Sequence, residues 1–240
     1  MPRRKRYQGA QVCQHIFDRG INKMRIFHDE KDYAAFIHRA FDFAEEYEIA
    51  LHAWVMMSNH FHFLLTPKNP RTISIFMQKL KGSYTQHYNK KYNRSGTLWE
   101  QRFRQLLADG QRYILELYRY IELNPVRAGM VKGPRQYHWS SFHTNAWGLH
   151  SYGLVEHPLY TLLGSDPDER QANYRDFIRR SFNVEASHYE AQCKIINTAR
   201  NQIAVYGDEE FHKMLSAQVD FPLVSYTRLV NMALADDEDE

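Results

Sequence analysis

The stretch from Ile49 to Thr66 contains two strand-length segments separated by only two residues. The first, IALHAWVMM, is continuously apolar, and the second, HFHFLLT at 60–66, alternates along its length. Buried strands have this length and composition, and a two-residue link such as Ser58-Asn59 suits a tight turn. The sequence therefore predicts an antiparallel β-hairpin over residues 49–66.

Helical periodicity surrounds this hairpin. Between Asp29 and Tyr47 the apolar side chains recur at the i, i+3, i+4, i+7 spacing of an amphipathic helix. Asn124-Pro125 should end a later helix, because the residue before proline is displaced from the α region. The predicted helices are 29–47, 72–89 and 111–123, and the predicted extended segments are 11–19 and part of 98–109. Two strand-helix-strand units with few strands predict an α+β fold, a small antiparallel sheet with helices on one face.

The chain changes character near residue 150. Residues 149–165 contain Gly and Pro and predict a linker, whereas 166–220 has the pattern of helices, near 167–182, 186–205 and 208–217. We therefore expect one domain at 1–150, a helical C-terminal accessory region at 151–235 and a disordered acidic tail at 236–240. The basic residues 1–8 are expected to form a flexible arm.

Composition excludes several classes of protein. The chain has 43% hydrophobic and 25% charged residues, which is typical of a globular protein. No apolar run approaches the roughly 18–20 residues of a membrane helix, and no apolar segment of a secretory signal follows the basic N-terminus. Cys13 and Cys193 form no CxxC pair or disulfide framework, so we expect a reducing cytoplasm, with Cys13 a small buried hydrophobe.

The net charge of +3 is unevenly distributed. Residues 1–148 carry 23 Lys and Arg against 12 Asp and Glu, whereas 149–240 carry 8 against 16. A basic half that is rich in aromatic residues predicts a polyanionic partner, and the alternative is an ordinary solvated basic surface. The acidic half is either an accessory segment packed on the core, which we favour, or a shield for the basic face.

His60 and His62 are the sharpest local feature. Side chains alternate across a strand, so two histidines at i and i+2 point to the same face while Phe61 points into the core. Two imidazoles on one face can ligate one divalent metal. The alternative is a pair of surface histidines on an edge strand.

Tyr120 and Asn124 are a second candidate pair, because residues four apart are neighbours on one helical face. A phenol has an unperturbed pKa of about 10 and is a poor nucleophile unless its proton is removed and its target is activated. The carbonyl oxygen of an Asn side chain suits a hard cation such as Mg²⁺ or Mn²⁺. The spacing alone favours the alternative, a tyrosine that packs on the sheet.

Three segments in order, WVMMSNHFHFLLTP, GTLWEQRFR and YRYIELNPVRAGMV followed by WSSF, resemble the REP-associated tyrosine transposases. These enzymes belong to the single-tyrosine branch of the HUH nuclease superfamily, and the resemblance covers roughly residues 1–150. It implies a ferredoxin-like HUH core that cuts and rejoins single-stranded DNA at hairpins. It also implies that His60 and His62 bind the metal, that Asn124 is the third ligand, and that Tyr120 is the nucleophile. Ser58 stands where the family has proline, which alters the turn and no ligand.

The resemblance implies a mechanism as well. Mg²⁺ or Mn²⁺ would polarise the scissile phosphate, and Tyr120 would attack it to give a 5′-phosphotyrosine and a free 3′-hydroxyl. The expected protein is bacterial and nucleoid-associated, a monomer or homodimer, with single-stranded or hairpin DNA as its partner. Two alternatives stay open: a transposase-derived protein that binds hairpins without cutting them, and a hydrolase in which His60 and His62 activate water.

Basic and aromatic side chains are the candidate DNA contacts. Lysines and arginines neutralise phosphates, and aromatic rings stack on unpaired bases. Trp99, between a basic loop and Arg102, is the best candidate for stacking, whereas Phe103 and the Tyr84, Tyr88, Tyr92 stripe favour core packing. The predicted phosphate contacts are Arg3, Arg4, Lys79, Lys81, Lys90, Arg94, Arg102, Arg104, Arg119 and Arg127.

Overall fold

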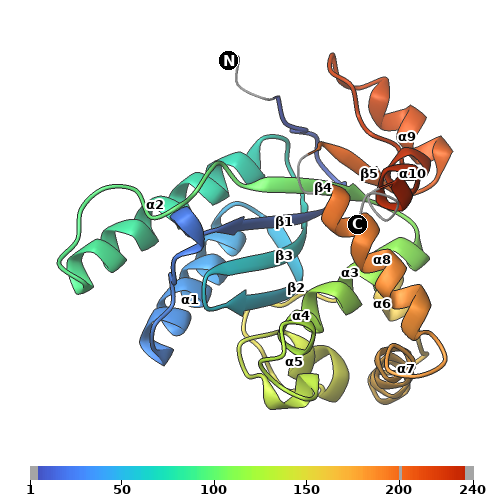
Figure 1. The fold of residues 1–240 in the computed structure, drawn as a ribbon, viewed down its shortest axis with the longest axis horizontal. Coiled ribbons are helices and arrows are strands. Elements are labelled where there is room, and N and C mark those ends of the chain that lie inside the picture. The colour runs from blue at the N-terminus through green and yellow to red at the C-terminus, as the bar shows by residue number, and fades with distance from the viewer. Residues whose placement is uncertain (1–4, 200–201, 236–240) are drawn as a thin grey trace.

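A five-stranded mixed sheet forms the centre of the protein, with strand order β2-β3-β1-β4-β5 (Figure 1). The computed structural model describes residues 5–199 and 202–235. The strands are β1 (Cys13–Arg19), β2 (Ile49–Met57), β3 (His60–Pro67), β4 (Arg104–Ala108) and β5 (Ala204–Tyr206). The predicted hairpin is confirmed, since β2 and β3 pair antiparallel around the Ser58-Asn59 turn.

Helices cover both faces of the sheet, so the expectation of helices on one face is wrong. The first helices are α1 (Glu30–Glu46), α2 (Thr72–Lys91), α3 (Gln111–Glu122), α4 (Asn124–Arg127), α5 (Phe142–Trp147) and α6 (Pro158–Thr161), with short 3-10 turns at Ile21–Lys23 and Pro134–Gln136. Phe61, Phe63 and Leu65 pack with α1 and α2 in one core. Val55 and Leu64 pack with α3 in the other. The unbroken apolar run of β2 is what a strand buried on both faces requires.

Helix ends follow local capping chemistry. Asp29 caps α1 by accepting a hydrogen bond from the backbone N–H of Asp32, as N-terminal Asp residues commonly do. Helix α3 ends at Glu122, close to the predicted end at 123, but Asn124 is already the first residue of the next helix and is not displaced from the α region. The chain then enters the short helix α4, with the proline in its first turn. Asn124, the first residue of α4, lines a cavity together with residues of β1 and β3.

The C-terminal region is not purely helical, which corrects the sequence prediction. It contains α7 (Pro167–Arg180), α8 (Ala186–Thr198), β5, α9 (Glu209–Ser216) and α10 (Tyr226–Ala235). Strand β5 pairs parallel with β4, although its residues were expected to end a helix at 205. Residues 5–8 also differ from a flexible arm: the Arg6 guanidinium stacks 3.6 Å from the Phe103 ring centroid, and the Tyr7 hydroxyl donates to Gln218.

Both edges of the sheet are covered by chain from beyond residue 139. Along β2, Ser140 bridges to Val55 and Leu154 bridges to Leu51. Along β5, Val224 bridges to Ala204. The expected linker at 149–165 is therefore a strap bonded to the sheet.

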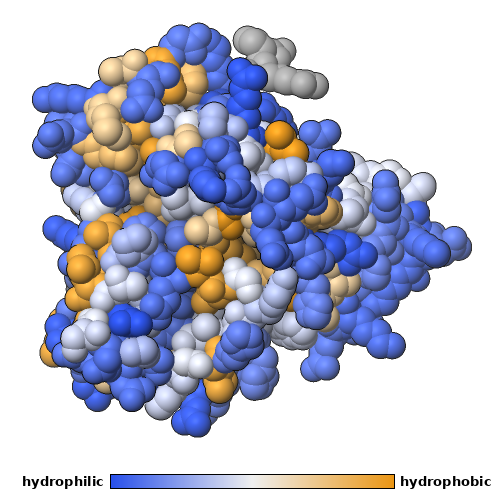
Figure 2. Space-filling model, turned by 180° about the vertical axis from the view of Figure 1, so that it is seen from behind, coloured by the Kyte–Doolittle hydropathy of each residue, from blue (hydrophilic) through white to orange (hydrophobic). Residues whose placement is uncertain are grey.

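The surface of the protein is mainly polar. Figure 2 shows the rear face, which is largely hydrophilic and carries several separate hydrophobic patches. Within residues 5–199 and 202–235, no helix is both long and apolar enough to cross a bilayer.

Candidate active site

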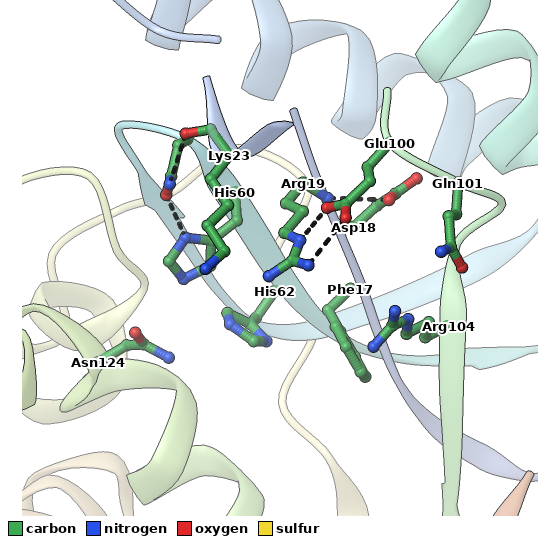
Figure 3. Close-up of a pocket in the computed structure, with 11 residues that line it drawn as sticks. Phe17, Asp18, Arg19, Lys23, His60, His62, Glu100, Gln101, Arg104 and Asn124 are labelled. Carbon is green, nitrogen blue, oxygen red and sulfur yellow. Dashed lines mark hydrogen bonds and ion pairs between the residues drawn. The ribbon is translucent and has the colours of Figure 1, made fainter. Parts of the chain in front are cut away.

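A cavity of about 230 Å³ opens beside β1 and β3, close to the first turn of α4 (Figure 3). His60, His62 and Asn124 all line it, so the structure brings together the three predicted metal ligands. Its other lining residues are Phe17, Asp18, Arg19, Lys23, Asn59, Glu100, Gln101 and Arg104. The cavity combines imidazole and amide groups with basic side chains and with the carboxylates of Asp18 and Glu100, which pair with Lys81 and Arg19. Donors for a cation thus lie beside basic side chains that suit an anion.

The two histidines lie on one face of β3, as the strand alternation predicted. Their ring centroids are 5.2 Å apart and their planes nearly perpendicular. The Nδ1 atom of His60 lies 2.6 Å from Oδ1 of Asn59. Because this oxygen only accepts hydrogen bonds, Nδ1 carries the proton and Nε2 keeps the lone pair that a metal needs.

Asn124 completes a donor set that fits a divalent metal. Its side chain is buried, and the amide nitrogen has no hydrogen-bond partner among the described residues. A half-turn about the last side-chain bond exchanges the amide oxygen and nitrogen, so the oxygen can face the cavity. Two imidazoles and one amide oxygen suit Mn²⁺ as well as Zn²⁺ and do not select the ion.

Tyr120 lies next to these ligands but is covered. Its ring centroid is 5.7 Å from that of His62, edge to face, yet the residue is only 1% exposed. The hydroxyl donates to Oδ1 of Asn197 on α8 at 2.8 Å. The Arg127 guanidinium lies 4.2 Å from the Tyr120 ring centroid and donates to Sγ of Cys193, also on α8. In this conformation the C-terminal region holds the phenol.

Comparison with known proteins points to one family. Residues 11–124 match the family model described as "Transposase IS200 like". The matched segment ends at Asn124 and so includes His60, His62 and Tyr120. Residues 11–124 of this chain are therefore similar to the IS200-like transposases. The resemblance inferred from three sequence segments is thereby confirmed.

Two known proteins are also similar to this chain. The "Putative REP-associated tyrosine transposase" of Haemophilus influenzae is 30% identical over 110 residues, which are 41% of this chain and 62% of that protein. The chain thus matches less than two thirds of the curated relative's length. A solved structure of a REP-associated tyrosine transposase bound to a REP hairpin superposes with a TM-score of 0.51, covering 65% of this chain and 93% of that one. At 18% identity this second likeness shows a shared fold.

Three side chains predicted to contact DNA are instead engaged within the protein in this structure. Trp99 is buried and donates its indole N–H to Thr85 Oγ1 at 3.0 Å, so its ring belongs to the core. Arg119 is fully buried and pairs with Glu116 and Glu185. Lys81 pairs with Asp18, and burial raises the pKa of Asp18 although the lysine opposes this shift.

The other side chains predicted to contact DNA lie in different parts of the structure. Arg104 lines the cavity, and Lys79, Lys90 and Arg102 are exposed. Arg94 donates to the Thr97 carbonyl oxygen within the loop after α2. Arg127 stacks on Tyr120, as described above. Arg3 and Arg4 lie outside the described residues, as does the acidic tail at 236–240.

Sequence reasoning missed Arg19, Lys23 and Asn59. Arg19 pairs with Glu100 at the cavity wall and lies opposite His60 in the sheet register (Figure 3). Asn59 belongs to the predicted turn, and its position immediately before His60 was the available signal. The position of Arg19 depends on which strands are neighbours, which the pattern along one strand does not reveal.

A second group of potential ligands lies elsewhere, where Cys13, His52 and His157 bring one ligand atom each within 4.8 Å of one another. Both ring nitrogens of His52 are already engaged, Nδ1 with the Val155 carbonyl at 2.8 Å and Nε2 with the Thr66 hydroxyl at 2.9 Å. Burial lowers the pKa of His52 to about 4, so the ring is neutral at pH 7. These bonds account for the group, and Cys13 is the buried residue that the sequence predicted.

Proposed function

We propose that this chain is a metal-dependent transposase that cuts and rejoins single-stranded DNA beside hairpin-forming repeats. The observation that carries this proposal is the shared cavity of His60, His62 and Asn124, with the Tyr120 ring 5.7 Å from that of His62. The family match and the REP hairpin bound by the solved relative support the same class of substrate.

Nε2 of His60, Nε2 of His62 and the side-chain oxygen of Asn124 are the proposed ligands of Mg²⁺ or Mn²⁺. When bound, such a cation acts as a Lewis acid on the scissile phosphate. The protein would contribute three uncharged metal ligands, with the guanidinium groups of Arg19 and Arg104 in the same cavity. Arg104 is the cavity residue that we propose contacts the phosphate, with Lys79, Lys90 and Arg102 contacting the DNA backbone farther out.

Tyr120 is the proposed nucleophile. Its hydroxyl oxygen would form a bond to phosphorus while the bond from phosphorus to the 3′-oxygen breaks. The phenolic proton would leave, and the departing 3′-oxygen would gain one, which gives a 5′-phosphotyrosine and a 3′-hydroxyl. Attack by a 3′-hydroxyl on that phosphotyrosine would reverse the exchange, so rejoining needs no ATP.

The burial of Tyr120 sets a condition on this chemistry. Because α8 holds the hydroxyl through Asn197, the phenol must leave that bond before it can reach a phosphate. The same observation favours a second candidate, a hairpin-binding protein that no longer cuts. A covalent protein–DNA adduct separates the two.

The test uses the full chain, Mn²⁺ and single-stranded hairpin oligonucleotides from repeats flanking its gene, labelled at either end. We expect an adduct on a denaturing gel that is lost in Tyr120→Phe and in His62→Ala. Tyr113→Phe is the matched control, since Tyr113 lies on the same helix with its ring against Tyr206 and Tyr226. Hairpin binding without an adduct under any divalent metal would favour the second candidate. Cleavage that survives Tyr120→Phe would exclude Tyr120 as the nucleophile.

A further inference from the structure

His15 is a buried histidine on β1 that lies between a proposed metal ligand and the proposed nucleophile. It is 1% exposed, and its Nε2 lies 2.8 Å from Nδ1 of His62. The two rings stack with centroids 5.0 Å apart and planes 23° from parallel. The Tyr120 ring contacts His15 edge to face at 5.6 Å.

The sheet register places these rings on one face. Phe17 is the direct antiparallel partner of His62, and His15 pairs with Leu64, so His15 and His62 are diagonal neighbours within reach of large side chains. Phe17 stacks on both histidines, at 5.2 Å and 5.5 Å. The contact between the two histidines therefore follows from strand geometry in the interior of the sheet.

A hydrogen bond between two imidazole nitrogens needs one donor and one acceptor. If His62 binds a metal through Nε2, its proton lies on Nδ1, and Nε2 of His15 must be the acceptor. Ligating histidines in proteins commonly donate their second N–H to such a partner, which fixes the tautomer and the ring orientation. Asn59 has this geometry toward His60, with an oxygen as acceptor.

We propose that His15 is a positioning residue, whose Nε2 accepts the Nδ1 proton of His62 and so presents Nε2 of His62 to the metal. This inference rests on the proposed function, because it needs His62 to be a ligand. It assigns a role to a buried polar side chain on the central strand of the sheet. His15 acts through His62 and touches no substrate.

Two substitutions separate the hydrogen bond from the packing. His15→Phe keeps an aromatic ring against Phe17 and Tyr120 but removes the acceptor. His15→Gln carries an amide oxygen near the position of Nε2 and so restores the acceptor. Ile16→Val is the matched control, since Ile16 is the next residue on β1 and packs in the opposite core.

The first measurement is Mn²⁺ affinity of the full chain without DNA, from the free-Mn²⁺ signal in electron paramagnetic resonance. We expect His15→Phe to weaken binding by about 10- to 100-fold. His15→Gln should recover most of that loss, and Ile16→Val should bind as the parent does. Wild-type affinity in a folded His15→Phe, with His62→Ala defective, would overturn the role of His15 and leave the proposed function intact. Wild-type affinity in His62→Ala would overturn both.

The second measurement needs no variant of His15. Long-range ¹H–¹⁵N spectra of the parent protein, with His62 assigned through His62→Ala, report which ring nitrogen carries the proton. We expect the Nδ1–H form for His62 before metal is added. The Nε2–H form would overturn the proposal even if His15→Phe failed to fold.

Discussion

Replacing Asn197 by alanine removes the acceptor that holds the Tyr120 hydroxyl, and we expect it to accelerate adduct formation. The bond is 2.8 Å long and joins the buried Tyr120 on α3 to the exposed Asn197 on α8. A typical hydrogen bond contributes about 0.5–1.5 kcal/mol to stability. Removing this bond therefore destabilises the covered state relative to one in which the phenol has left α8.

The expected acceleration follows from the fraction of molecules in the released state, in which the Tyr120 hydroxyl has left Asn197. When the covered state dominates, the released fraction changes tenfold for each roughly 1.4 kcal/mol. Losing about 1 kcal/mol should therefore raise the single-turnover rate of adduct formation about fivefold. The assay mixes protein in excess with a labelled hairpin strand and Mn²⁺ and follows the covalent band over time.

Two controls make the result specific to this bond. Asn197→Asp keeps an acceptor oxygen and should not accelerate the reaction. Thr198 lies on the same helix, and among the described contacts its hydroxyl donates to the Lys194 carbonyl within α8. The Thr198→Ala protein should therefore form the adduct at the parent rate. An unchanged or slower rate in a folded Asn197→Ala would refute the reasoning that α8 restrains the nucleophile.

Three further outcomes can be measured on the same chain. Arg119→Met should lower the free energy of unfolding in urea by about 3–5 kcal/mol, because it removes the cation that pairs with the buried Glu116. A loss of hairpin affinity at unchanged stability would contradict a structural role for Arg119. The free energy of unfolding should fall by up to about 3 kcal/mol as the pH drops from 6.5 to about 4. Over this range His52 takes up a proton in the unfolded chain but stays neutral in the folded chain. A His52→Gln protein whose stability depends on pH in the same way would contradict this. Lys79→Ala and Lys90→Ala should each reduce the steepness of log K for hairpin binding against log salt concentration by about 0.7–0.9. An unchanged slope would show that the lysine does not contact a DNA phosphate.

Local patterns predicted the elements that build the site. The hairpin, the shared face of His60 and His62, and the end of α3 before Pro125 all follow from spacing within a few residues, and the structure confirms them. The resemblance added Asn124 and Tyr120, whose roles stay predictions.

Long-range partners account for what the sequence did not predict. The sequence pattern is that of a surface cation, but Arg119 is buried and pairs both with Glu116, one turn away on α3, and with Glu185, 66 residues along the chain. The sequence favoured base stacking for Trp99, but its indole N–H donates to the Lys81 backbone carbonyl and the Thr85 hydroxyl on α2. Strand β5 is three residues long and has too short a pattern to recognise. The bond from Tyr120 to Asn197 likewise joins positions that no local pattern connects.

The covered edges of the sheet have a consequence for how this protein can be dissected. A chain cut after residue 150 would lose the strap at Leu154 and both β5 and its neighbour Val224, which leaves β4 as a bare edge and β2 partly uncovered. Exposed strand edges recruit strands from other molecules, so the shortened protein would be prone to self-association. The influence of the C-terminal region on DNA is therefore better measured by single substitutions on α8 than by truncation.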